Sequence, residues 1–503
     1  MLNINSQLQL AIQQHQKNNL INAEEIYKKI ISINPKHYEC LYLLGTLYAQ
    51  QNKFNLSISF LNKSIKLNKN NQDAYYNLGN VYQNLNVFEK AILNYKSAIK
   101  INNKYLKALL NLGHIYYIQK NFKKSINSYL EILKFDNNYT DALNNLGTVY
   151  AEIKNNTEAL KYFNKAVVSD HKNFRSYYNL ATLYSNKRDY LNAVEYFKKA
   201  IKNKSLYPSA YNGLGYAYKK LDKFNEAKKN YEISIEQDPK YVLAKLNYGN
   251  LLDIMGEHKK AIAIYSETIK INPNMLSARW ASLNTFPMIY KNTEEISEYT
   301  HHFSNEIQNI EKFISKNKVI DKKEVIKGLL NSTNFYLHYQ GIDNTNLQKK
   351  YANVIETLTN QIYSIKKIKK EDEDKIKIGF VSPCFIEHSV SNTHKNFYLK
   401  LNKNKFKTYI YHINDEKDEY TKYVAQKTFS FYHSSDVDKI IKKISEDTLD
   451  ILFFIDIGMD PKMQILGSLR FAKIQINGNA QPITSGFKNM DYVISSTLME
   501  PIN

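Results

Sequence analysis

Cysteine is scarce in this sequence. Only Cys40 and Cys384 occur among its 503 residues, far apart and without the spacing of a metal-ligand pair. Neither a disulfide framework nor a zinc site is therefore supported, and a reducing compartment fits the composition. His301 and His302 also lack partners at a useful spacing, so we predict no metal site.

Targeting segments and long apolar runs are missing as well. Residues 1–5 carry neither the basic region nor the apolar stretch with which a signal peptide begins. Nowhere does the sequence approach the roughly 18 consecutive apolar residues that a membrane span needs. We therefore predict a soluble, cytoplasmic protein with no membrane partner.

Acidic residues are too few to balance the basic ones. The sequence has 48 Asp and Glu against 69 Lys and Arg, which gives a formal net charge of +21. Such a charge would suit nucleic acid or another acidic partner electrostatically. However, the Lys and Arg residues are spread along the chain without a concentrated block, which favours a solvated basic surface over a charged binding face. We therefore predict no nucleic-acid partner.

The most prominent feature of the sequence is an internal repeat of 34 residues. In each copy except the last, a small residue follows Leu and precedes Tyr by three positions. A second small residue comes 12 positions later, and Leu61 or an aromatic residue stands four positions beyond it. The first small residues are Gly45, Gly79, Gly113, Gly147, Ala181, Gly215 and Gly249.

Close packing of paired helices explains this pattern. A small residue on the first helix lets the second helix cross at short distance, and the aromatic ring fills the space beside it. Neither helix of a pair can bury its apolar stripe alone, so the pairs must stack on one another. The pattern resembles the tetratricopeptide repeat. With a degenerate first copy that contains Ala23, Tyr27 and Pro35, we predict about eight units in an α-solenoid, a tetratricopeptide superhelix over residues 4–275.

A row of asparagines recurs within the repeats. Asparagine stands directly before the Leu-Gly pair or its equivalent in five copies. An amide offers both donors and an acceptor, as recognition of an extended peptide backbone requires. The row also resembles the asparagine ladder of O-GlcNAc transferases. The alternative is that these abundant side chains cap local turns. We predict peptide contact by Asn77, Asn111, Asn145, Asn179 and Asn247.

Residues 276–374 are predicted to form a helical linker region. Within it, the aromatic segment 335–341 could be taken for a base-stacking face. Because Tyr336, Tyr339 and nearby leucines stand at helical spacings, we predict that this segment belongs to the core.

From Lys375 onward, short apolar strands alternate with helical segments such as 436–444, which predicts a parallel α/β sheet. Asp418 and Thr421 are interpreted as the start of a helix. Ligands gather at the carboxyl ends of the strands in such sheets. The predicted strands are 376–382, 407–413, 429–432, 450–455, 474–477 and 492–495.

Four segments in this half resemble the amino-terminal catalytic domain of bacterial O-GlcNAc transferase and SPINDLY homologues. They are IGFVSPCFIEHSV (378–390), DILFFIDIGM (450–459), RFAKIQ (470–475) and PITSGFKNMDYVISSTLMEP (482–501). Cys384 stands where that family usually has Asp, and no activating base is evident that would make it a nucleophile.

The resemblance implies a Rossmann-like domain over 375–503, the amino-terminal half of a GT-B glycosyltransferase. Enzymes of this type hold the active site between two such domains. We therefore expect residues 1–503 to be incomplete as an enzyme, with the second domain supplied by a longer chain or by a separate polypeptide.

The implied reaction is an inverting transfer of N-acetylglucosamine from UDP-GlcNAc to Ser or Thr of a protein acceptor that the repeats bind, with no cofactor. Fucose or glucose remains open as the donor sugar. The alternative is a catalytically inactive scaffold that binds extended peptides. By the resemblance, His388 faces sugar and acceptor, and a loop lines the sugar pocket with Asn479, Ala480, Pro482, Thr484, Ser485 and Gly486.

Overall fold

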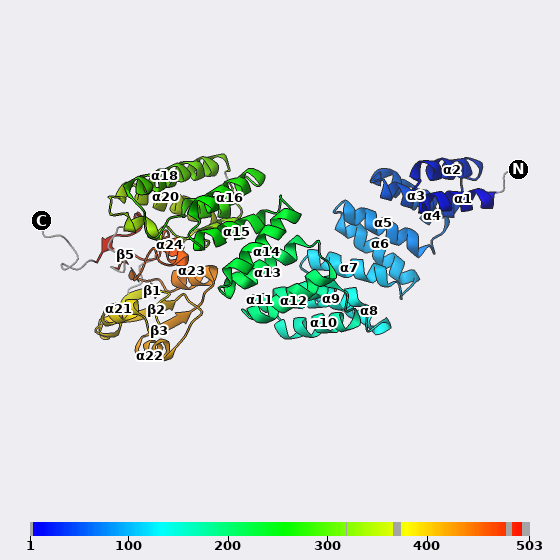
Figure 1. Ribbon diagram of the computed structural model, residues 1–503. Helices are drawn as coiled ribbons and strands as arrows, with labels where there is room; N and C mark the ends of the chain where they lie inside the picture. The colour runs from blue at the N-terminus through cyan, green and yellow to red at the C-terminus, as the bar shows by residue number, and fades with distance from the viewer. Residues whose placement is uncertain (1–3, 318, 366–373, 479–484, 495–503) are drawn as a thin grey trace. The chain divides into compact units, whose positions relative to one another are not determined.

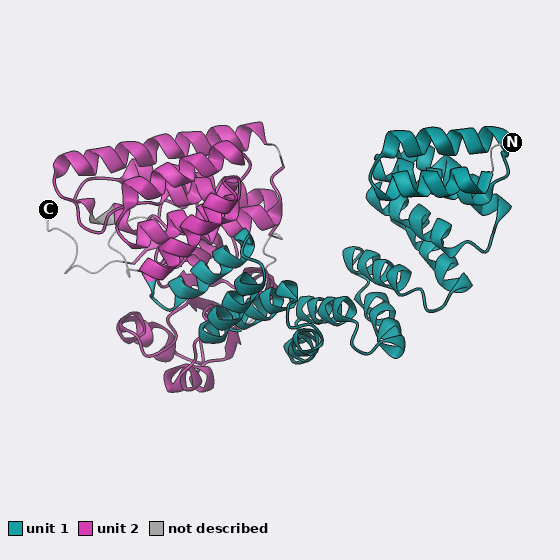
Figure 2. Ribbon diagram, turned by 45° about the vertical axis from the view of Figure 1, so that its right-hand side comes forward, with its two compact units in different colours: residues 1–223 teal, residues 224–503 magenta. Residues whose placement is uncertain are grey.

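The structure is a computed structural model that describes residues 4–317, 319–365, 374–478 and 485–494. The chain divides into two compact units, residues 1–223 and 224–503 (Figure 2). Each unit is described by itself below. Within the described part of the chain, every helix is too short or too polar to cross a bilayer.

Residues 4–271 form sixteen helices that alternate between 13 and 14 residues in length (Figure 1). In the first unit, each helix packs against the next one along the chain. The predicted α-solenoid is therefore confirmed, whereas the number of about eight repeat units over residues 4–275 stays a prediction. The helices are α1 (Ile4–Gln16), α2 (Leu20–Ile33), α3 (Tyr38–Gln50), α4 (Phe54–Leu67), α5 (Gln72–Asn84), α6 (Phe88–Ile101), α7 (Leu106–Ile118), α8 (Phe122–Phe135), α9 (Thr140–Glu152), α10 (Asn156–Ser169), α11 (Phe174–Asn186), α12 (Tyr190–Asn203), α13 (Pro208–Lys220), α14 (Phe224–Gln237), α15 (Val242–Ile254) and α16 (His258–Ile271).

Close contact between a glycine and an aromatic ring joins the two helices of a repeat, as the sequence predicts. A Cβ atom added to Gly113 on α7 would lie 2.6 Å from the ring of Tyr129 on α8. The same addition to Gly147 on α9 would lie 2.5 Å from Phe163 on α10. Both distances are too short for a real contact, so only glycine lets these helices approach so closely.

Left-handed turns separate the two helices of each repeat. A residue with positive φ recurs every 34 positions, and of these residues the last alone is glycine. At Lys154, the N–H donates to the carbonyl of Ala151, and the next N–H, that of Asn155, donates to Tyr150 (2.9 Å). This pattern ends a helix with a Schellman-type turn. The residues are Asn18, Asn52, Asn86, Lys120, Lys154, Arg188, Asp222 and Gly256.

The helices that follow the repeats share one hydrophobic core with the sheet. Trp280, Phe303 and Tyr351 are buried in the same cluster as Leu452 and Phe454 of the sheet. Residues 276–362 therefore pack on the sheet rather than forming an independent spacer. The elements are α17 (Leu276–Leu283), α18 (Thr293–Lys316), α19 (Lys322–Leu329), a 3-10 helix η1 (Phe335–Gln340) and α20 (Thr345–Ile362).

One segment of this region differs from its prediction. Residues 335–340 form a 3-10 helix, which places residues three apart on one face. Leu337 and Gln340 accordingly share the buried face, whereas Tyr336 is 36% exposed. The assignment of Tyr336 to the core is therefore wrong.

Six parallel strands form one sheet in the order β3-β2-β1-β4-β5-β6. This order confirms the predicted α/β class, and the strand bounds differ from the predicted ones by two residues at most. The strands are β1 (Ile376–Ser382), β2 (Phe406–His412), β3 (Ser430–His433), β4 (Ile451–Phe454), β5 (Ile474–Asn477) and β6 (Tyr492–Val493). The helices between them are α21 (Ser389–Leu399), α22 (Glu419–Lys427), α23 (Val437–Glu446) and α24 (Pro461–Gly467).

Alternate strand residues enter two separate cores, because successive side chains of a strand point to opposite faces. Phe380 and Phe453 pack with Tyr398 of α21 on one face. Leu452 and Phe454 pack on the other face with residues of α20, α23 and α24. The two cores cover the faces of the sheet. The predicted site begins at the carboxyl edge, where the strands end.

Candidate functional site

The strand order reverses between β1 and β4. Chain connections run outward from this pair in both directions, so the loops after the two strands diverge. A crevice at such a point is where open α/β sheets bind ligands. Ser382 ends β1, and Asp456 follows β4 by two residues, so both stand at this position.

The loop after β1 is held in place by short polar contacts. The Ser382 hydroxyl accepts the N–H of Cys384 (3.0 Å), and the Ser391 hydroxyl donates to the carbonyl of Cys384. The Cys384 Sγ atom lies 3.6 Å from Oδ2 of Asp456. These contacts tie the loop that leads to His388 both to its own strand and to the loop after β4.

Asp418 and Thr421 secure the same loop from the start of α22. They form the predicted helix start as a capping box, which confirms that interpretation. Oδ2 of Asp418 also accepts the N–H of Glu387 (2.6 Å), and the Thr421 hydroxyl donates to the carbonyl of Phe385 (2.8 Å). Burial alone would raise the pKa of Asp418, but the hydrogen bonds from the N–H groups of Glu387 and Thr421 lower it below its usual value. Its carboxylate therefore helps to fix the residues in front of His388.

His388 is the N-cap residue of α21, and its side chain is half-buried. Nδ1 accepts the N–H of Val390 (3.2 Å). In the neutral ring, the hydrogen then stands on Nε2, because a nitrogen that accepts a hydrogen bond carries none. The cap thus leaves His388 with an N–H that can donate to an oxygen of a ligand.

Asp456 is fully buried, with 1% of its surface exposed. Burial is the main cause that raises its pKa to about 8, and the negative charge of Asp460 adds to the shift. Among the residues that the structure describes, its Oδ1 atom has no hydrogen-bond partner, and neither does Oδ1 of the buried Asn477 at the end of β5. Burial, with the nearby Asp456, raises the pKa of the Cys384 thiol to about 12. At neutral pH this cluster is a pair of neutral acids rather than a nucleophile with its base.

Most of the predicted sugar-pocket loop lies outside the described residues, namely Asn479, Ala480, Pro482 and Thr484. Its last two residues are described, and both rest on α20. Gln348 of α20 donates to the carbonyl of Ser485 (3.1 Å). Gly486 has a φ of 75°, and a Cβ atom there would lie 2.6 Å from the carbonyl oxygen of Gln348. The role of these six residues in a sugar pocket stays a prediction.

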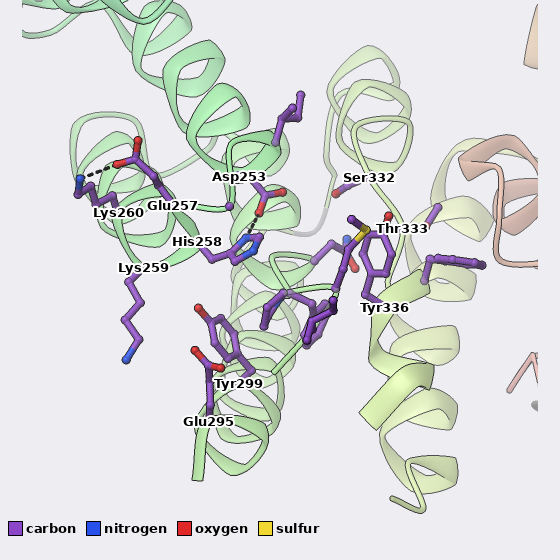
Figure 3. Close-up of a pocket in the computed structure, with 18 of the residues that line it drawn as sticks. Asp253, Glu257, His258, Lys259, Lys260, Glu295, Tyr299, Ser332, Thr333 and Tyr336 are labelled. Atoms are coloured by element: carbon purple, nitrogen blue, oxygen red, sulfur yellow. Dashed lines mark hydrogen bonds and ion pairs between the residues drawn. The ribbon is translucent and has the colours of Figure 1, made fainter. Parts of the chain in front are cut away.

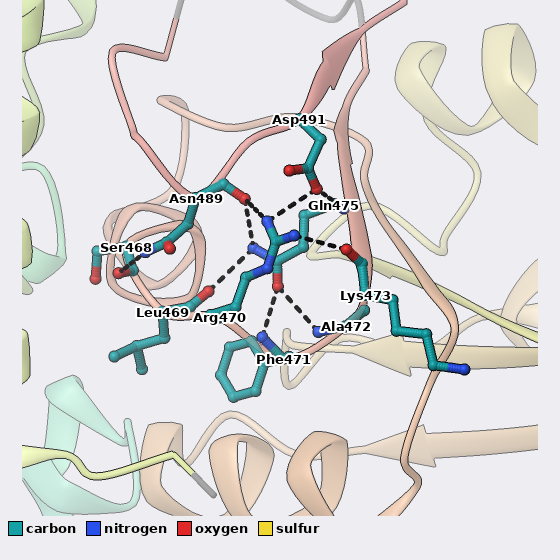
Figure 4. A network of polar contacts seen from close by, with 9 residues as sticks. All are labelled: Ser468, Leu469, Arg470, Phe471, Ala472, Lys473, Gln475, Asn489 and Asp491. Atoms are coloured by element: carbon teal, nitrogen blue, oxygen red, sulfur yellow. Dashed lines mark hydrogen bonds and ion pairs between the residues drawn. The ribbon is translucent and has the colours of Figure 1, made fainter. Parts of the chain in front are cut away.

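The motif RFAKIQ at 470–475 forms a structural network (Figure 4). The buried side chain of Gln475 accepts the N–H of Phe471 (2.7 Å) and donates to the carbonyls of Leu469 and Asn489 (both 3.0 Å). Arg470 donates to the carbonyl of Asn489 and lies 2.8 Å from a carboxylate oxygen of Asp491. Asp491 precedes β6, and Gln475 is near the start of β5, so the network lies at the amino edge. It stabilises the sheet at the edge opposite the predicted site.

The asparagine row connects successive repeats. Asn77 on α5 donates to the Tyr42 hydroxyl (3.3 Å) and to the Thr46 hydroxyl (3.0 Å). Asn111 on α7 makes the equivalent bonds one repeat later, to the Tyr76 hydroxyl (3.3 Å) and to the side-chain oxygen of Asn80 (2.9 Å).

The row continues through the next two repeats. Asn179 on α11 donates to the side-chain oxygen of Asn144 (3.0 Å). Burial raises the pKa of Tyr129 to about 12, and a hydrogen bond with Asn145 on α9 offsets part of this rise. Asn247 lies on α15 of the second unit and is half-buried like the others.

These bonds use the amide nitrogens of the asparagines as donors and leave their amide oxygens unused. Within the described residues, the amide oxygens of Asn77, Asn111 and Asn179 accept no hydrogen bond. These three side chains therefore keep their acceptor oxygens available, which the sequence alone does not reveal, and peptide contact by the five asparagines stays a prediction.

Comparison with known families finds similarities in both parts of the chain. Residues 343–503 match the model described as Glycosyl transferase family 41. This part of the chain, which follows the repeats, is therefore similar to family 41 glycosyltransferases. The repeat models TPR repeat and Tetratricopeptide repeat match 45–86, 113–154, 72–105, 140–170, 174–205, 208–241 and 243–275. A search of curated proteins finds no match.

Several solved structures are similar to parts of the chain. The chain is 28% identical to MamA over 32% of its own length and 95% of that chain, with a TM-score of 0.31. It is 14% identical to a mutant form of the O-GlcNAc transferase from Thermobaculum terrenum, with a TM-score of 0.42. That match covers 64% of this chain and only 53% of the transferase. YrrB, titled a TPR protein with an unusual peptide-binding site, is 21% identical over 37% of this chain and 95% of its own, with a TM-score of 0.30.

Proposed function

We propose that the chain is the acceptor-binding part of a protein O-glycosyltransferase of the SPINDLY-like type. It would transfer N-acetylglucosamine from UDP-GlcNAc to Ser or Thr of protein acceptors. The observation that carries this proposal is the family 41 match over residues 343–503, directly after a series of tetratricopeptide repeats.

In this proposal, His388 acts as a hydrogen-bond donor. Its cap bond to Val390 places the hydrogen on Nε2, where it can stabilise negative charge on a diphosphate or orient the acceptor hydroxyl. To remove a proton through Nε2, the ring would have to carry its hydrogen on Nδ1, which would break the cap. The contacts of Cys384, Asp418 and Thr421 hold this donor in one place before a ligand arrives, and such preorganisation favours the transition state.

The repeats would bind the acceptor as an extended strand. The amide oxygens of Asn77, Asn111 and Asn179 can each accept one N–H of the peptide backbone, whatever its side chains, so many sequences could bind. The alternative function is a scaffold that binds peptides without transferring sugar. It shares this peptide-binding step and differs in that the sheet would catalyse no transfer.

Peptide titration of residues 1–503 tests the shared step. We expect replacement of Asn111, Asn145 and Asn179 by Ala to weaken binding of Ser/Thr-rich peptides strongly, because each lost backbone hydrogen bond costs about 1 kcal/mol. The same variant loses bonds between repeats, so its melting temperature must be measured as well. A matched control is Asn94→Ala on α6, where a half-buried asparagine donates to the carbonyl of Lys90 within its own helix. Unchanged affinity in a folded triple variant would refute the role of the row.

A further inference from the structure

A groove of about 970 Å³ lies within the second unit (Figure 3). Its walls are the turn between α15 and α16, residues 284–291 after α17, the first turns of α18 and residues 332–336. Met459, from the loop after β4, completes the lining. The groove thus extends from the last repeat to the carboxyl edge of the sheet, and its volume lies at the upper end for ligand sites.

Exposed apolar side chains converge on this groove. Met288 is 65% exposed and Ile289 is 87% exposed, in the segment that follows α17. Ile254, Tyr336 and Met459 come from three other segments and are 57%, 36% and 40% exposed. Single exposed apolar residues are common, but side chains from four segments that line one groove are typical of a binding surface.

Most charged groups of the groove already have a partner. His258 lies 2.8 Å from a carboxylate oxygen of Asp253, and Glu257 pairs with both Lys228 and Lys260 (Figure 3 shows the first and the last of these contacts). Lys259 pairs with Glu298 beside the groove, and the Glu295 carboxylate accepts the backbone N–H of Lys291 (2.7 Å). A charged ligand would compete with these partners, so the groove favours an uncharged side chain.

Two lining residues carry a buried polar atom that has no partner among the described residues. Asn284 is only 6% exposed, and its amide nitrogen donates to the carbonyl of Trp280 (3.0 Å), while its buried oxygen accepts no hydrogen bond from them. The buried hydroxyl of Ser332 lacks a partner there too. A peptide unit, which brings an N–H together with a side chain, can satisfy such atoms once the lining opens to admit it.

We propose that this groove binds the acceptor polypeptide through one aliphatic or aromatic side chain near the residue that is modified. The proposal rests on the proposed function. A polypeptide bound on the last repeat, which lies in the same unit, would reach the sheet along the groove, because the two ends of the groove are that repeat and the loop of Met459. The asparagine row reads the backbone irrespective of sequence, so the groove would be the point at which acceptors are selected.

Fluorescence anisotropy with labelled peptides tests this inference on residues 1–503. One peptide set carries Leu or Phe at successive positions around a Ser/Thr, and a matched set carries Gly there. The double variant Met288→Ser, Ile289→Ser should weaken binding of the best apolar peptide at least about tenfold, because the side chain loses its buried contacts. The double variant should leave the affinity for the Gly peptides unchanged. Val319→Ser, which removes a side chain that is 90% exposed outside this groove, is the control.

Each other outcome has one meaning. If the unaltered protein binds none of the peptides, the proposed function is wrong at its peptide-binding step, and this inference falls with it. If it binds them but the double variant loses both peptide sets equally or neither, only the inference about the groove is wrong. If the double variant instead converts a dimer into a monomer in light scattering, the groove is an interface between copies of the chain, which also overturns the proposal.

Discussion

At the scale of single residues, Asp456 combines complete burial with a carboxyl oxygen that has no partner among the described residues. The described groups that influence its pKa are Ser382, Cys384, Asp460 and its own backbone, none of which is a cation. A carboxyl group in such a place persists as the neutral acid at neutral pH. Asp456 can therefore donate a hydrogen bond, and it connects the loop before His388 to the loop before Met459.

This burial predicts a specific dependence of stability on pH. The folded pKa of about 8 lies above the value of about 3.9 in an unfolded chain, so the unfolded state releases the proton first. Stability contributed by this group is therefore lost as the pH rises from about 4 to about 8. Asp456→Asn removes the titration, so its stability relative to the unaltered protein should rise across that window by up to about 1.4 kcal/mol per pH unit.

Thermal unfolding at several pH values between 5 and 8 measures the effect. The quantity to compare is the change with pH in the difference between the two melting temperatures, since the new amide can shift both at every pH. Asp374→Asn, at an exposed position, is the matched control and should show no such trend. A difference that does not change with pH would contradict a neutral, buried Asp456.

At the scale of elements, the left-handed turn in each repeat is occupied mainly by residues with a side chain. Lys154 has a φ of 62°, a conformation that costs most L-residues about 1–2 kcal/mol. Glycine avoids this cost but loses more entropy on folding. We therefore expect Lys154→Gly to stabilise the protein by about 0.5–1 kcal/mol and to raise its melting temperature.

Lys165→Gly provides the comparison within the same repeat. Lys165 is exposed in the middle of α10, where glycine costs about 1 kcal/mol relative to alanine. The two substitutions exchange the same residue types, so they should shift the melting temperature in opposite directions. A decrease of the same size for both would mean that residue 154 does not occupy a left-handed turn.

Much of the fold could be predicted from the sequence because its signals are local and repeated. The 34-residue spacing fixes which helix contacts which, and contacts such as Gly113 with Tyr129 follow from it. The turns were not predictable in this way, because Asn, Lys, Arg and Asp occupy them in place of a consistent glycine. Tyr336 was misplaced because a 3-10 helix turns after three residues, whereas the spacing was interpreted as that of an α-helix.

Less of the site could be predicted, since it depends on contacts between distant segments. The start of α22 at Asp418 and Thr421 was predictable, but its hold on the loop before His388 was not. The RFAKIQ motif marks the family without lying at the ligand edge, because Gln475 and Arg470 stabilise the start of β5. The groove has no sequence signature, because its lining comes from segments as far apart as Ile254 and Met459.

At the scale of the whole molecule, the proposed function divides two tasks between two parts of the chain. The repeats would offer acceptor oxygens to a peptide backbone, and the sheet would offer His388, which its cap bond to Val390 positions. In the GT-B type that the chain resembles, a second domain closes the active site. Residues 1–503 tested alone would then leave the donor diphosphate in water, which screens the charges that stabilise a leaving group.

Sugar transfer is the most direct test of the central claim. Incorporation of radiolabelled N-acetylglucosamine from UDP-GlcNAc into Ser/Thr-rich peptides should be measured for the protein as its gene encodes it, beside residues 1–503 with and without a family 41 second domain. We predict transfer wherever a second domain is present and none by residues 1–503 alone. His388→Ala should lower transfer about tenfold or more while peptide affinity stays unchanged. Robust transfer by residues 1–503 alone, or transfer that His388→Ala leaves intact, would contradict this account, and so would the absence of transfer from UDP-GlcNAc, UDP-glucose and GDP-fucose in every form of the protein.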